Sequence, residues 1–318
     1  MSTATKVLDT VLDRTVVPGY SKIGYAVRSR FWPADPAPGA LAGKTALVTG
    51  ANSGLGKAAV AGLARLGASV HLVVRNTEKG EQARQEIVNE IPQAHLEVHR
   101  CDISSLADVR AFAEGFAPDT LDVLVHNAGA LPPSRAETPE GNETTLATHV
   151  LGPFLLTGLL RPALAAARGR VVFVSSGGMY TAKLRSDDPQ YREGEYAGAK
   201  AYARTKRMQV VLAEQWAARL ADDGVTVHST HPGWADTPGV TGSLPGFNKI
   251  MGPLLRTPDQ GADTIVWLAA ADEPTRASGH FWHDRRVRPT HYLPWQHDTP
   301  EARKRLWDLC VEETGLVI

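Results

Sequence analysis

Residues 49–56 read Thr-Gly-Ala-Asn-Ser-Gly-Leu-Gly and decide the fold of this chain. They follow an apolar run at 45–48 that predicts a buried strand, and they lead into 57–66, whose apolar spacing predicts a helix. A glycine-rich turn between strand and helix lets a phosphate approach the backbone, and the helix N-terminus offers free N–H groups. The stretch therefore predicts a dinucleotide site. The alternative is a tight turn without a ligand, because the glycines do not follow the spacing GxGxxG.

Composition narrows the class of protein. The chain has 318 residues, of which 43% are hydrophobic, and this is enough for a sizeable core. Lys plus Arg and Asp plus Glu both number 34, so no net charge attracts nucleic acid. The two cysteines, Cys101 and Cys310, form neither a disulfide framework nor a metal quartet, as is typical of a reducing compartment. No apolar run approaches the roughly 20 residues of a transmembrane helix, and charges interrupt any signal-peptide core, so we expect a cytoplasmic protein.

Residues 1–43 predict an arm in front of the main domain. Four apolar residues between 7 and 12 share one helical face, which predicts a short amphipathic helix that ends at Pro18 and Gly19. Aromatic and basic residues are interleaved after it, before a linker rich in proline and alanine at 33–42. The arm either packs on the body or on a second subunit, or it contacts a membrane or covers a lipophilic substrate.

Strand and helix patterns alternate from 44 to 318, which predicts a single domain. The expected strands are 45–48, 69–74, 95–99, 121–125, 170–174, 225–229 and 280–282. After the helix at 57–66, the expected helices are 77–91, 106–116, 143–167, 202–221, 258–271 and 300–313. Strands that alternate with helices pair in parallel through right-handed crossovers. We therefore predict a Rossmann-type, doubly wound α/β sheet of about seven strands.

Polar residues follow five of these strands, at the edge of the sheet where ligands of such folds bind. In chain order they are Arg75, Asp102, His126 to Gly129, Ser175 with Ser176, and His231 to Gly233. An arginine after the second strand suits a 2′-phosphate and so favours NADP over NAD. The clusters predict one cofactor site at this edge.

Tyr202 and Lys206 form a candidate acid/base pair. They are four residues apart on a predicted helix, so their side chains share one face. A free tyrosine titrates near about pH 10, and a nearby ammonium group favours its phenolate form. Tyr202 is therefore a candidate proton donor to a carbonyl. Tyr196 and Lys200 have the same spacing, and the spacing alone does not choose between the two pairs.

Two further regions bear on ligands. The segment 234–256 contains an apolar group that either packs on the body or covers a lipophilic substrate: Leu244, Pro245, Phe247, Ile250, Met251, Leu254 and Leu255. The C-terminal histidines lack a metal-ligand spacing, so no metal is assigned to His280, His283, His291 or His297.

Taken together, these motifs resemble the short-chain dehydrogenase/reductase family, in particular its retinol-dehydrogenase-like branch, across almost all of 44–290. The match comprises Thr49-Gly50 with Gly54 and Gly56, Asn127-Ala128-Gly129, Ser176, Tyr202 with Lys206, and Pro232-Gly233 with Thr237. The resemblance implies an NADP(H)-dependent oxidoreductase that interconverts a carbonyl and an alcohol. It also selects Tyr202 over Tyr196, because the distance from Tyr202 to Pro232 is the one familiar in the family.

The resemblance implies a role for each site residue. Tyr202 would be the general acid/base, Lys206 would lower its pKa and hold the nicotinamide ribose, and Ser176 would bind the substrate oxygen. The cofactor would contact Gly50, Asn52, Ser53, Gly54, Leu55, Gly56, Arg75, Asp102, Ile103, Asn127, Ala128, Gly129, Tyr202, Lys206, Pro232, Gly233 and Thr237.

Two histidines depart from the family pattern. His126 replaces the first asparagine of the Asn-Asn-Ala-Gly motif, and we interpret it as structural. His149 lies three residues before Gly152, where the family usually has an asparagine that supports a water leading to the lysine. It either replaces that asparagine in the proton path, or weakens catalysis, or adds a titration near neutral pH.

Other functions are compatible with the same motifs. One is an NADP-binding protein of low turnover that acts through its arm as an interaction or redox-sensing module. Another is a lyase or epimerase on the same scaffold, whose usual substrate would need a more polar cover than the apolar group at 244–255. Homo-oligomers are common in the family, and the sequence does not decide the oligomeric state.

Overall fold

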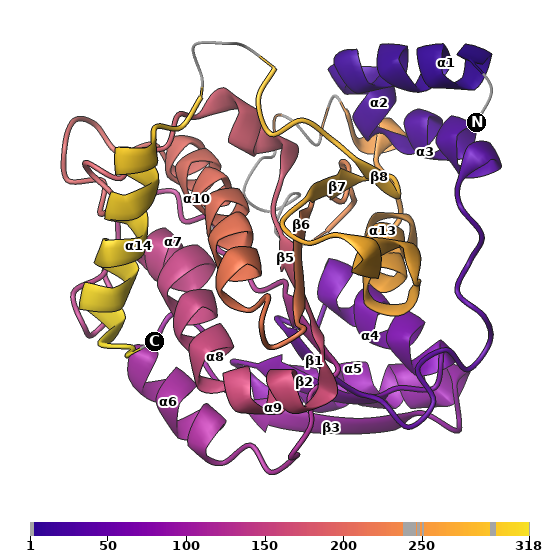
Figure 1. Cartoon of the computed structure of the whole chain (residues 1–318), viewed down its shortest axis with the longest axis horizontal. Coiled ribbons are helices and arrows are strands. Elements are labelled where there is room, and N and C mark those ends of the chain that lie inside the picture. The colour runs from indigo at the N-terminus through magenta and orange to yellow at the C-terminus, as the bar shows by residue number, and fades with distance from the viewer. Residues whose placement is uncertain (1–2, 238–245, 247–248, 250, 293–296, 318) are drawn as a thin grey trace.

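A central sheet of eight strands organises the chain in the computed structural model, which describes residues 3–237, 246, 249, 251–292 and 297–317. The strand order is β3-β2-β1-β4-β5-β6-β7-β8 (Figure 1). The strands are β1 (Thr45–Thr49), β2 (Ser69–Val74), β3 (His95–Arg100), β4 (Val123–His126), β5 (Arg170–Val174), β6 (Thr226–Thr230), β7 (Phe281–His283) and β8 (Arg286–Val287). Neighbours from β3 to β7 pair in parallel, and β8 alone pairs antiparallel.

The doubly wound α/β fold is thus confirmed, with eight strands instead of about seven. The strand that the sequence did not predict is β8. It returns on β7 through Asp284 and Arg285, which have φ values of 53° and 54°. A two-residue hairpin with positive φ normally contains glycine or asparagine, and this turn has neither, so it left no sequence signal.

Helices cover both faces of the sheet (Figure 1). One face carries α4 (Gly54–Arg65), α5 (Thr77–Glu90) and α13 (Pro258–Ala270), and the other carries α6 (Leu106–Glu114), α8 (Gly152–Leu159) and α10 (Gly198–Arg219), with α14 (Pro300–Thr314) packed against α10. Each face has its own hydrophobic core. Leu47 belongs to one core and its neighbour Val48 to the other, because successive strand residues point to opposite faces.

The helix expected at 143–167 is broken. It consists of α7 (Thr144–Leu146), a π-helical turn (Ala147–Leu151), α8 and α9 (Arg161–Ala167). The π-helical turn contains His149, and such turns recur at functional sites. Among the residues described, no single helix is long and apolar enough to cross a membrane; the bent pair Thr144–Leu159 and Arg161–Ala167 passes only when taken together.

Two other helices begin earlier than expected, and short 3-10 turns join the larger elements. The helix of the glycine-rich turn begins at Gly54 instead of 57, and α10 begins at Gly198 instead of 202. The 3-10 turns are Ser29–Phe31, Gly177–Thr181, Gly252–Leu254 and Glu273–Arg276.

The N-terminal arm packs on the body of the protein beside β8 (Figure 1). It contains α1 (Thr3–Arg14), α2 (Val16–Tyr20) and α3 (Lys22–Arg28), so Pro18 and Gly19 lie inside a second helix and do not end the first one as expected. The ring of Tyr20 is buried edge-on against His231, with the ring centroids 4.4 Å apart. The backbone carbonyl of Tyr20 accepts a hydrogen bond from the Trp234 amide at 2.8 Å.

A buried carboxylate fastens the arm to the body. Asp284 accepts hydrogen bonds from Arg28 at 2.9 Å and from both terminal nitrogens of Arg256 at 2.6 and 2.9 Å. Burial alone would raise the pKa of Asp284, but the guanidinium of Arg256 holds it well below its usual value. Arg256 also donates to the carbonyls of Gly19 and Ser21, so one ionic group connects the body to two places in the arm.

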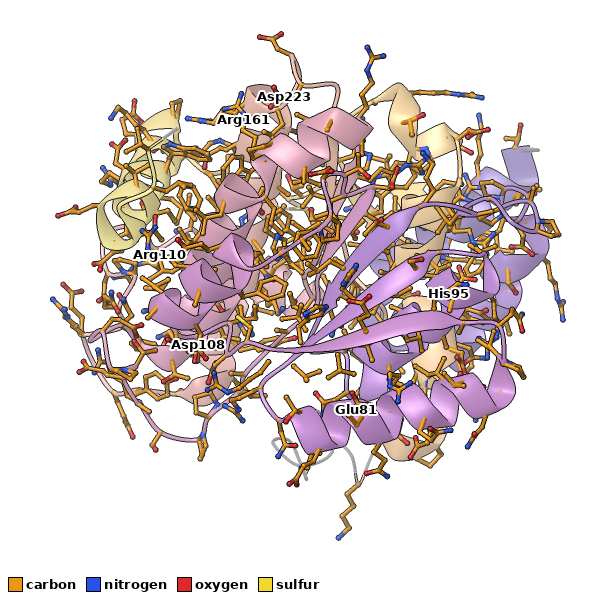
Figure 2. All side chains as sticks on the ribbon, turned by 90° about the horizontal axis from the view of Figure 1, so that it is seen from below. Glu81, His95, Asp108, Arg110, Arg161 and Asp223 are labelled. Carbon is orange, nitrogen blue, oxygen red and sulfur yellow. The ribbon has the colours of Figure 1, made fainter. Side chains whose placement is uncertain are left out.

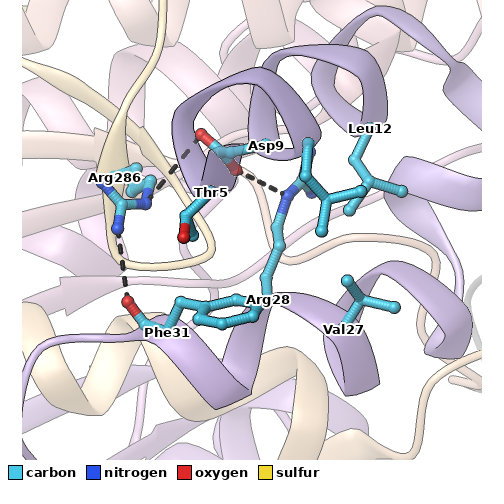
Figure 3. Close-up of a pocket in the computed structure, with 8 residues that line it drawn as sticks. Thr5, Asp9, Leu12, Val27, Arg28, Phe31 and Arg286 are labelled. Atoms are coloured by element: carbon cyan, nitrogen blue, oxygen red, sulfur yellow. Dashed lines mark hydrogen bonds and ion pairs between the residues drawn. The ribbon is translucent and has the colours of Figure 1, made fainter. Parts of the chain in front are cut away.

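The outer face of the arm remains apolar. Its exposed side chains are Val7, Leu8, Val11, Val16, Val17, Ile23 and Phe31. A small pocket between α1, α3 and β8 is bounded by the carboxylate of Asp9, which lies between Arg28 and Arg286 (Figure 3). This pocket belongs to the packing of the arm. Membrane contact through the outer face stays a prediction.

Replacement of Asp284 by asparagine should destabilise the protein strongly. The change leaves the buried guanidinium of Arg256 without its counter-charge, while Arg28 keeps only Asp9, and loss of one partner of a buried ion pair costs about 3–5 kcal/mol. Urea unfolding measures the effect. Asp35→Asn is the matched control, because Asp35 also pairs with an arginine, Arg285, but is 82% exposed. If both substitutions lowered the free energy of unfolding by the same small amount, the buried Asp284 group would not be what holds the arm.

Candidate cofactor and catalytic site

The expected site lies where β1 and β4 end side by side. From β1 the chain continues to β2, toward one edge of the sheet, and from β4 it continues to β5, toward the opposite edge. Ligands of doubly wound sheets bind where the strand order reverses in this way. The hydroxyl of Thr49 accepts hydrogen bonds from the amides of Asn127 and Ala128, both at 3.0 Å. The Asn127 side chain donates to the carbonyls of Thr49 and Gly50 at 3.0 and 3.2 Å. These bonds join the two strand ends.

The glycine-rich turn leaves no room for side chains. Gly50 has a φ of 65°, and a Cβ there would lie 2.8 Å from the Cα of Ala128. A Cβ on Gly56 would lie 2.2 Å from the carbonyl oxygen of Gly50. The side chain of Ser53, at the N-cap of α4, accepts no capping hydrogen bond. The amides of the first helical turn can therefore donate to an anion, which fits the pyrophosphate of a dinucleotide.

Arg75 and Asp102 lie together at the ends of β2 and β3. Their closest charged atoms are 3.9 Å apart, and the Arg75 side chain is 79% exposed. Asp102 accepts hydrogen bonds from the amide and hydroxyl of Ser104, which fix its carboxylate, and Ile103 beside it is buried. An exposed guanidinium at this place can pair with a phosphate from solvent.

Ser176, Tyr202 and Lys206 come together beyond the end of β5. Ser176 hydrogen-bonds to the hydroxyl of Tyr202. The ammonium of Lys206 lies 5.4 Å from the centre of the Tyr202 ring and donates to the carbonyl of Val174 at 2.8 Å. Ser175 instead donates to the backbone carbonyl of Lys206 at 2.8 Å, and so supports α10.

The protonation of this group differs from the expectation in one respect. Burial raises the pKa of Tyr202, and the hydrogen bond from Ser176 only partly opposes it. Burial also lowers the pKa of Lys206 to about 7. The expected net lowering of the Tyr202 pKa is wrong, because burial disfavours the charged forms of both Tyr202 and Lys206.

The second tyrosine–lysine pair is separated from this group. Tyr196 lies before the start of α10, while Lys200 is an exposed residue of its first turn, so the two do not share a helix face. The Tyr196 hydroxyl donates to Glu143 at 3.0 Å. Burial and the Glu143 carboxylate raise the pKa of Tyr196 to about 12.

His149 hydrogen-bonds to the segment after β4 and to α10, next to the Tyr202 ring. Its Nε2 accepts a hydrogen bond from the Ala130 amide at 3.0 Å, so its Nδ1 carries the hydrogen and donates to Thr205 at 2.8 Å. The ring is edge-on to Tyr202, with centroids 5.3 Å apart. Burial and the Lys206 ammonium lower the pKa of His149 well below its usual value, so of the three alternatives for His149 an added titration near neutral pH is contradicted.

The other residues singled out in the sequence fall into four groups. His126 hydrogen-bonds to Thr157 in the core, and burial lowers its pKa to about 3. The C-terminal histidines are dispersed: His283 stacks on His231, His280 lies by His228, and His291 by His297. The remaining expected cofactor contacts that keep accessible surface are Asn52, Gly54, Leu55, Ala128, Gly129 and Thr237, whereas Pro232 and Gly233 are buried. Of the apolar group at 244–255, Leu244, Pro245, Phe247 and Ile250 lie outside the described residues.

Sequence reasoning missed Arg256 and Tyr20 near the site. Arg256 donates to the Pro232 carbonyl at 3.3 Å, and a Cβ on Gly233 would lie 2.4 Å from its Nε. The ring of Tyr20 lies against Gly177, where a Cβ would approach it to 2.7 Å. The arm thus supports the loop after Ser176. No local pattern predicts these contacts, because Tyr20 and Gly177 are more than 150 residues apart in the chain, and Arg256 follows Pro232 by 24 residues.

Comparisons with known proteins agree with this geometry. The family model described as short chain dehydrogenase matches residues 44–245. The chain belongs to the short-chain dehydrogenase/reductase family. Dehydrogenase/reductase SDR family member 12 from Bos taurus is 40% identical over 297 residues, which cover 92% of this chain and 93% of the relative. Retinol dehydrogenase 12 from Bos taurus is 35% identical over 281 residues, which cover 87% and 88% of the two chains. The retinol-dehydrogenase-like branch is therefore confirmed.

Solved structures are similar as well. An uncharacterised protein from Mycobacterium paratuberculosis superposes with a TM-score of 0.70 at 29% identity and covers 91% of this chain and 97% of its own. A protein described as an NAD(P) dependent gluconate 5-dehydrogenase from Beutenbergia cavernae, solved with NADP at low occupancy, has a TM-score of 0.62 at 27% identity, with 77% and 96% covered. This family member is accordingly a carbonyl/alcohol oxidoreductase that uses an NAD(P) cofactor.

Replacement of His149 by asparagine should preserve turnover and lower stability. Both ring nitrogens are bonded within the protein and the ring is neutral, so it has no free atom with which to exchange a proton. The shorter amide leaves a gap and cannot keep both bonds, at a cost of roughly 1–3 kcal/mol. Steady-state turnover and urea unfolding, measured on the same preparation, separate the two effects. A tenfold loss of turnover would show that the histidine has its own part in the reaction.

Proposed function

We propose that this chain is an NADP(H)-dependent oxidoreductase of lipophilic carbonyls and alcohols, with Tyr202 as its general acid/base. The observation that carries the proposal is the convergence of Ser176, Tyr202 and Lys206 beyond β5, beside the glycine-rich turn. The names of the relatives support the substrate class, since several are retinol dehydrogenases and retinol is a lipophilic alcohol.

The side chains have distinct parts in the proposed reaction. The nicotinamide, when bound, supplies or accepts the hydride at the reacting carbon. Ser176 donates a hydrogen bond to the substrate oxygen and holds it near the phenol. Tyr202 gives its proton to that oxygen as the carbonyl becomes an alcohol, and takes a proton back in the opposite direction. Lys206 contributes positive charge near the phenolate that this transfer leaves.

The raised pKa of Tyr202 fits a proton donor. Burial keeps the phenol protonated at neutral pH, so it is ready to give a proton to an oxygen that gains negative charge. The lowered pKa of Lys206, about 7, leaves its ammonium only partly populated at neutral pH. The position of Lys206, 5.4 Å from the Tyr202 ring centre, lets the ammonium act through space without a direct bond.

Arg75 supports the preference for NADP. It follows β2, where an NAD-dependent enzyme of this fold would favour an acid that binds the ribose hydroxyl. Its side chain is 79% exposed, and its weak 3.9 Å contact with Asp102 leaves it able to turn toward a 2′-phosphate. The NADP carried by the relative from Beutenbergia cavernae is a property of that protein and adds support for the proposal.

Tyr202→Phe should lower turnover at least a hundredfold and leave cofactor affinity nearly unchanged. The substitution removes only the hydroxyl, and a general acid contributes about a hundredfold to ten-thousandfold to the rate. NADPH oxidation with a panel of lipophilic aldehydes and ketones measures turnover, and NADPH fluorescence measures binding. Tyr196→Phe is the matched control and should retain wild-type turnover, because that hydroxyl bonds only to Glu143 and Thr145.

The same experiment tests the alternative of a binding module. Tight NADPH binding without turnover on any substrate of the panel would favour a protein of low turnover that acts through its arm. Full activity of Tyr202→Phe, or equal losses in Tyr202→Phe and Tyr196→Phe, would contradict the assignment of the general acid/base.

Arg75→Ala should weaken NADPH binding at least tenfold and change NADH binding less than twofold. Only NADPH carries the 2′-phosphate, and a hydrogen bond to a charged group contributes about 1.5–3 kcal/mol. Fluorescence titration with each cofactor gives both dissociation constants. Arg100→Ala is the control, since Arg100 is also exposed near this edge but pairs with Asp108. Equal weakening of NADPH and NADH would contradict the role of Arg75 in NADP preference.

A further inference from the structure

Two histidines and a glutamate converge on the outer strands of the sheet, away from the catalytic group. His71 of β2 lies opposite Glu97 of β3 in the register, and His99 follows Glu97 by two residues. All three side chains therefore point to the same face of the sheet. The Nδ1 of His71 lies 2.8 Å from the Nε2 of His99, and one carboxylate oxygen of Glu97 lies 3.6 Å from each of these nitrogens.

The three separations fit a metal ion. A single point about 2.0 Å from all three atoms exists, which matches zinc–nitrogen and zinc–oxygen bonds of about 2.0–2.2 Å. The separations of 2.8, 3.6 and 3.6 Å lie on either side of the roughly 3.3 Å between neighbouring ligands of a tetrahedral zinc ion. We infer that His71, Glu97 and His99 bind a divalent transition-metal ion of the zinc type, with water as the fourth ligand.

The surroundings suit such a site. The His71 side chain is 8% exposed and the His99 side chain 30%, and their rings pack edge-on against Phe116 and Phe112, which fixes their orientation. The Glu97 side chain is 70% exposed, so an ion can enter from that side. Burial lowers the pKa of both histidines, so both imidazoles are neutral at physiological pH, as coordination requires.

The donor set selects the kind of ion. Two imidazoles and one carboxylate suit zinc, copper or nickel, whereas magnesium and calcium prefer sites made of oxygen atoms. Among the described residues, this is the one group of three or more such side chains whose ligand atoms lie this close together. The site joins β3, which ends the sheet, to β2, so a bound ion would stabilise the folded state by binding it selectively.

The test uses the untagged full-length protein after removal of metals with a chelator. Zinc chloride is titrated by calorimetry, and the unfolding temperature is recorded with zinc chloride and, separately, with magnesium chloride. The wild-type protein should bind one zinc ion and unfold at a higher temperature with zinc but not with magnesium. His99→Gln should weaken zinc binding at least tenfold and remove the shift in unfolding temperature. Glu97→Gln should weaken zinc binding less, because both imidazoles remain and the amide oxygen of the glutamine can still act as a weaker third ligand.

Two histidine variants serve as controls. His95→Gln changes an exposed histidine at the start of the same strand (Figure 2), and His297→Gln changes one beside His291. Both should bind zinc as the wild-type protein does. The circular dichroism spectrum of His99→Gln, compared with the wild type, establishes that this variant is folded.

Three outcomes would overturn the site. The first is wild-type protein without a zinc-dependent shift. The second is unchanged zinc affinity in folded His99→Gln, which would leave the two histidines as a hydrogen-bonded pair of the sheet. The third is an equal loss of affinity in His95→Gln or His297→Gln, which would place the ion elsewhere. None of these results depends on turnover, so the proposed oxidoreductase function is tested separately.

Discussion

The hydrogen bonds between Thr49 and Asn127 are the constraint on which the site depends. Parallel strands that send their crossovers to opposite sides leave a crevice between their ends. Here the Thr49 hydroxyl accepts from two amides after β4, and Asn127 donates back to two carbonyls of β1 and the glycine-rich turn. The crevice is therefore held at a fixed width, and Gly50 fits against Ala128 only without a side chain.

A second constraint is the burial of charge between the arm and the body. Asp284 and two arginines are almost fully inaccessible, and a buried carboxylate is stable only when opposite charge and hydrogen bonds surround it. Arg256 also bonds to the Pro232 carbonyl, so the group that fastens the arm shapes the turn after β6. The arm is consequently part of the architecture of the site, and its removal would expose the buried carboxylate.

The sequence predicted what short-range patterns encode. Apolar runs located the parallel strands, and polar residues after them marked the site edge, because strand burial and strand ends are local properties. Three features were beyond such patterns. The break at His149 comes from a π-helical turn that keeps the apolar spacing, β8 follows a hairpin without glycine, and Arg28 meets Asp284 across 256 residues. The pairing of His71 with His99 likewise requires the register of β2 and β3.

The catalytic group shows why proximity alone does not set a pKa. Spacing on α10 suggested that the Lys206 ammonium lowers the pKa of Tyr202, yet the low-polarity surroundings raise it and lower that of Lys206. Burial penalises each charge separately, and the two charges offset this penalty only when they form together. In the proposed reaction, phenolate forms only when Tyr202 gives up its proton. The ammonium of Lys206 is then most stable, because it faces a new negative charge at the moment of transfer.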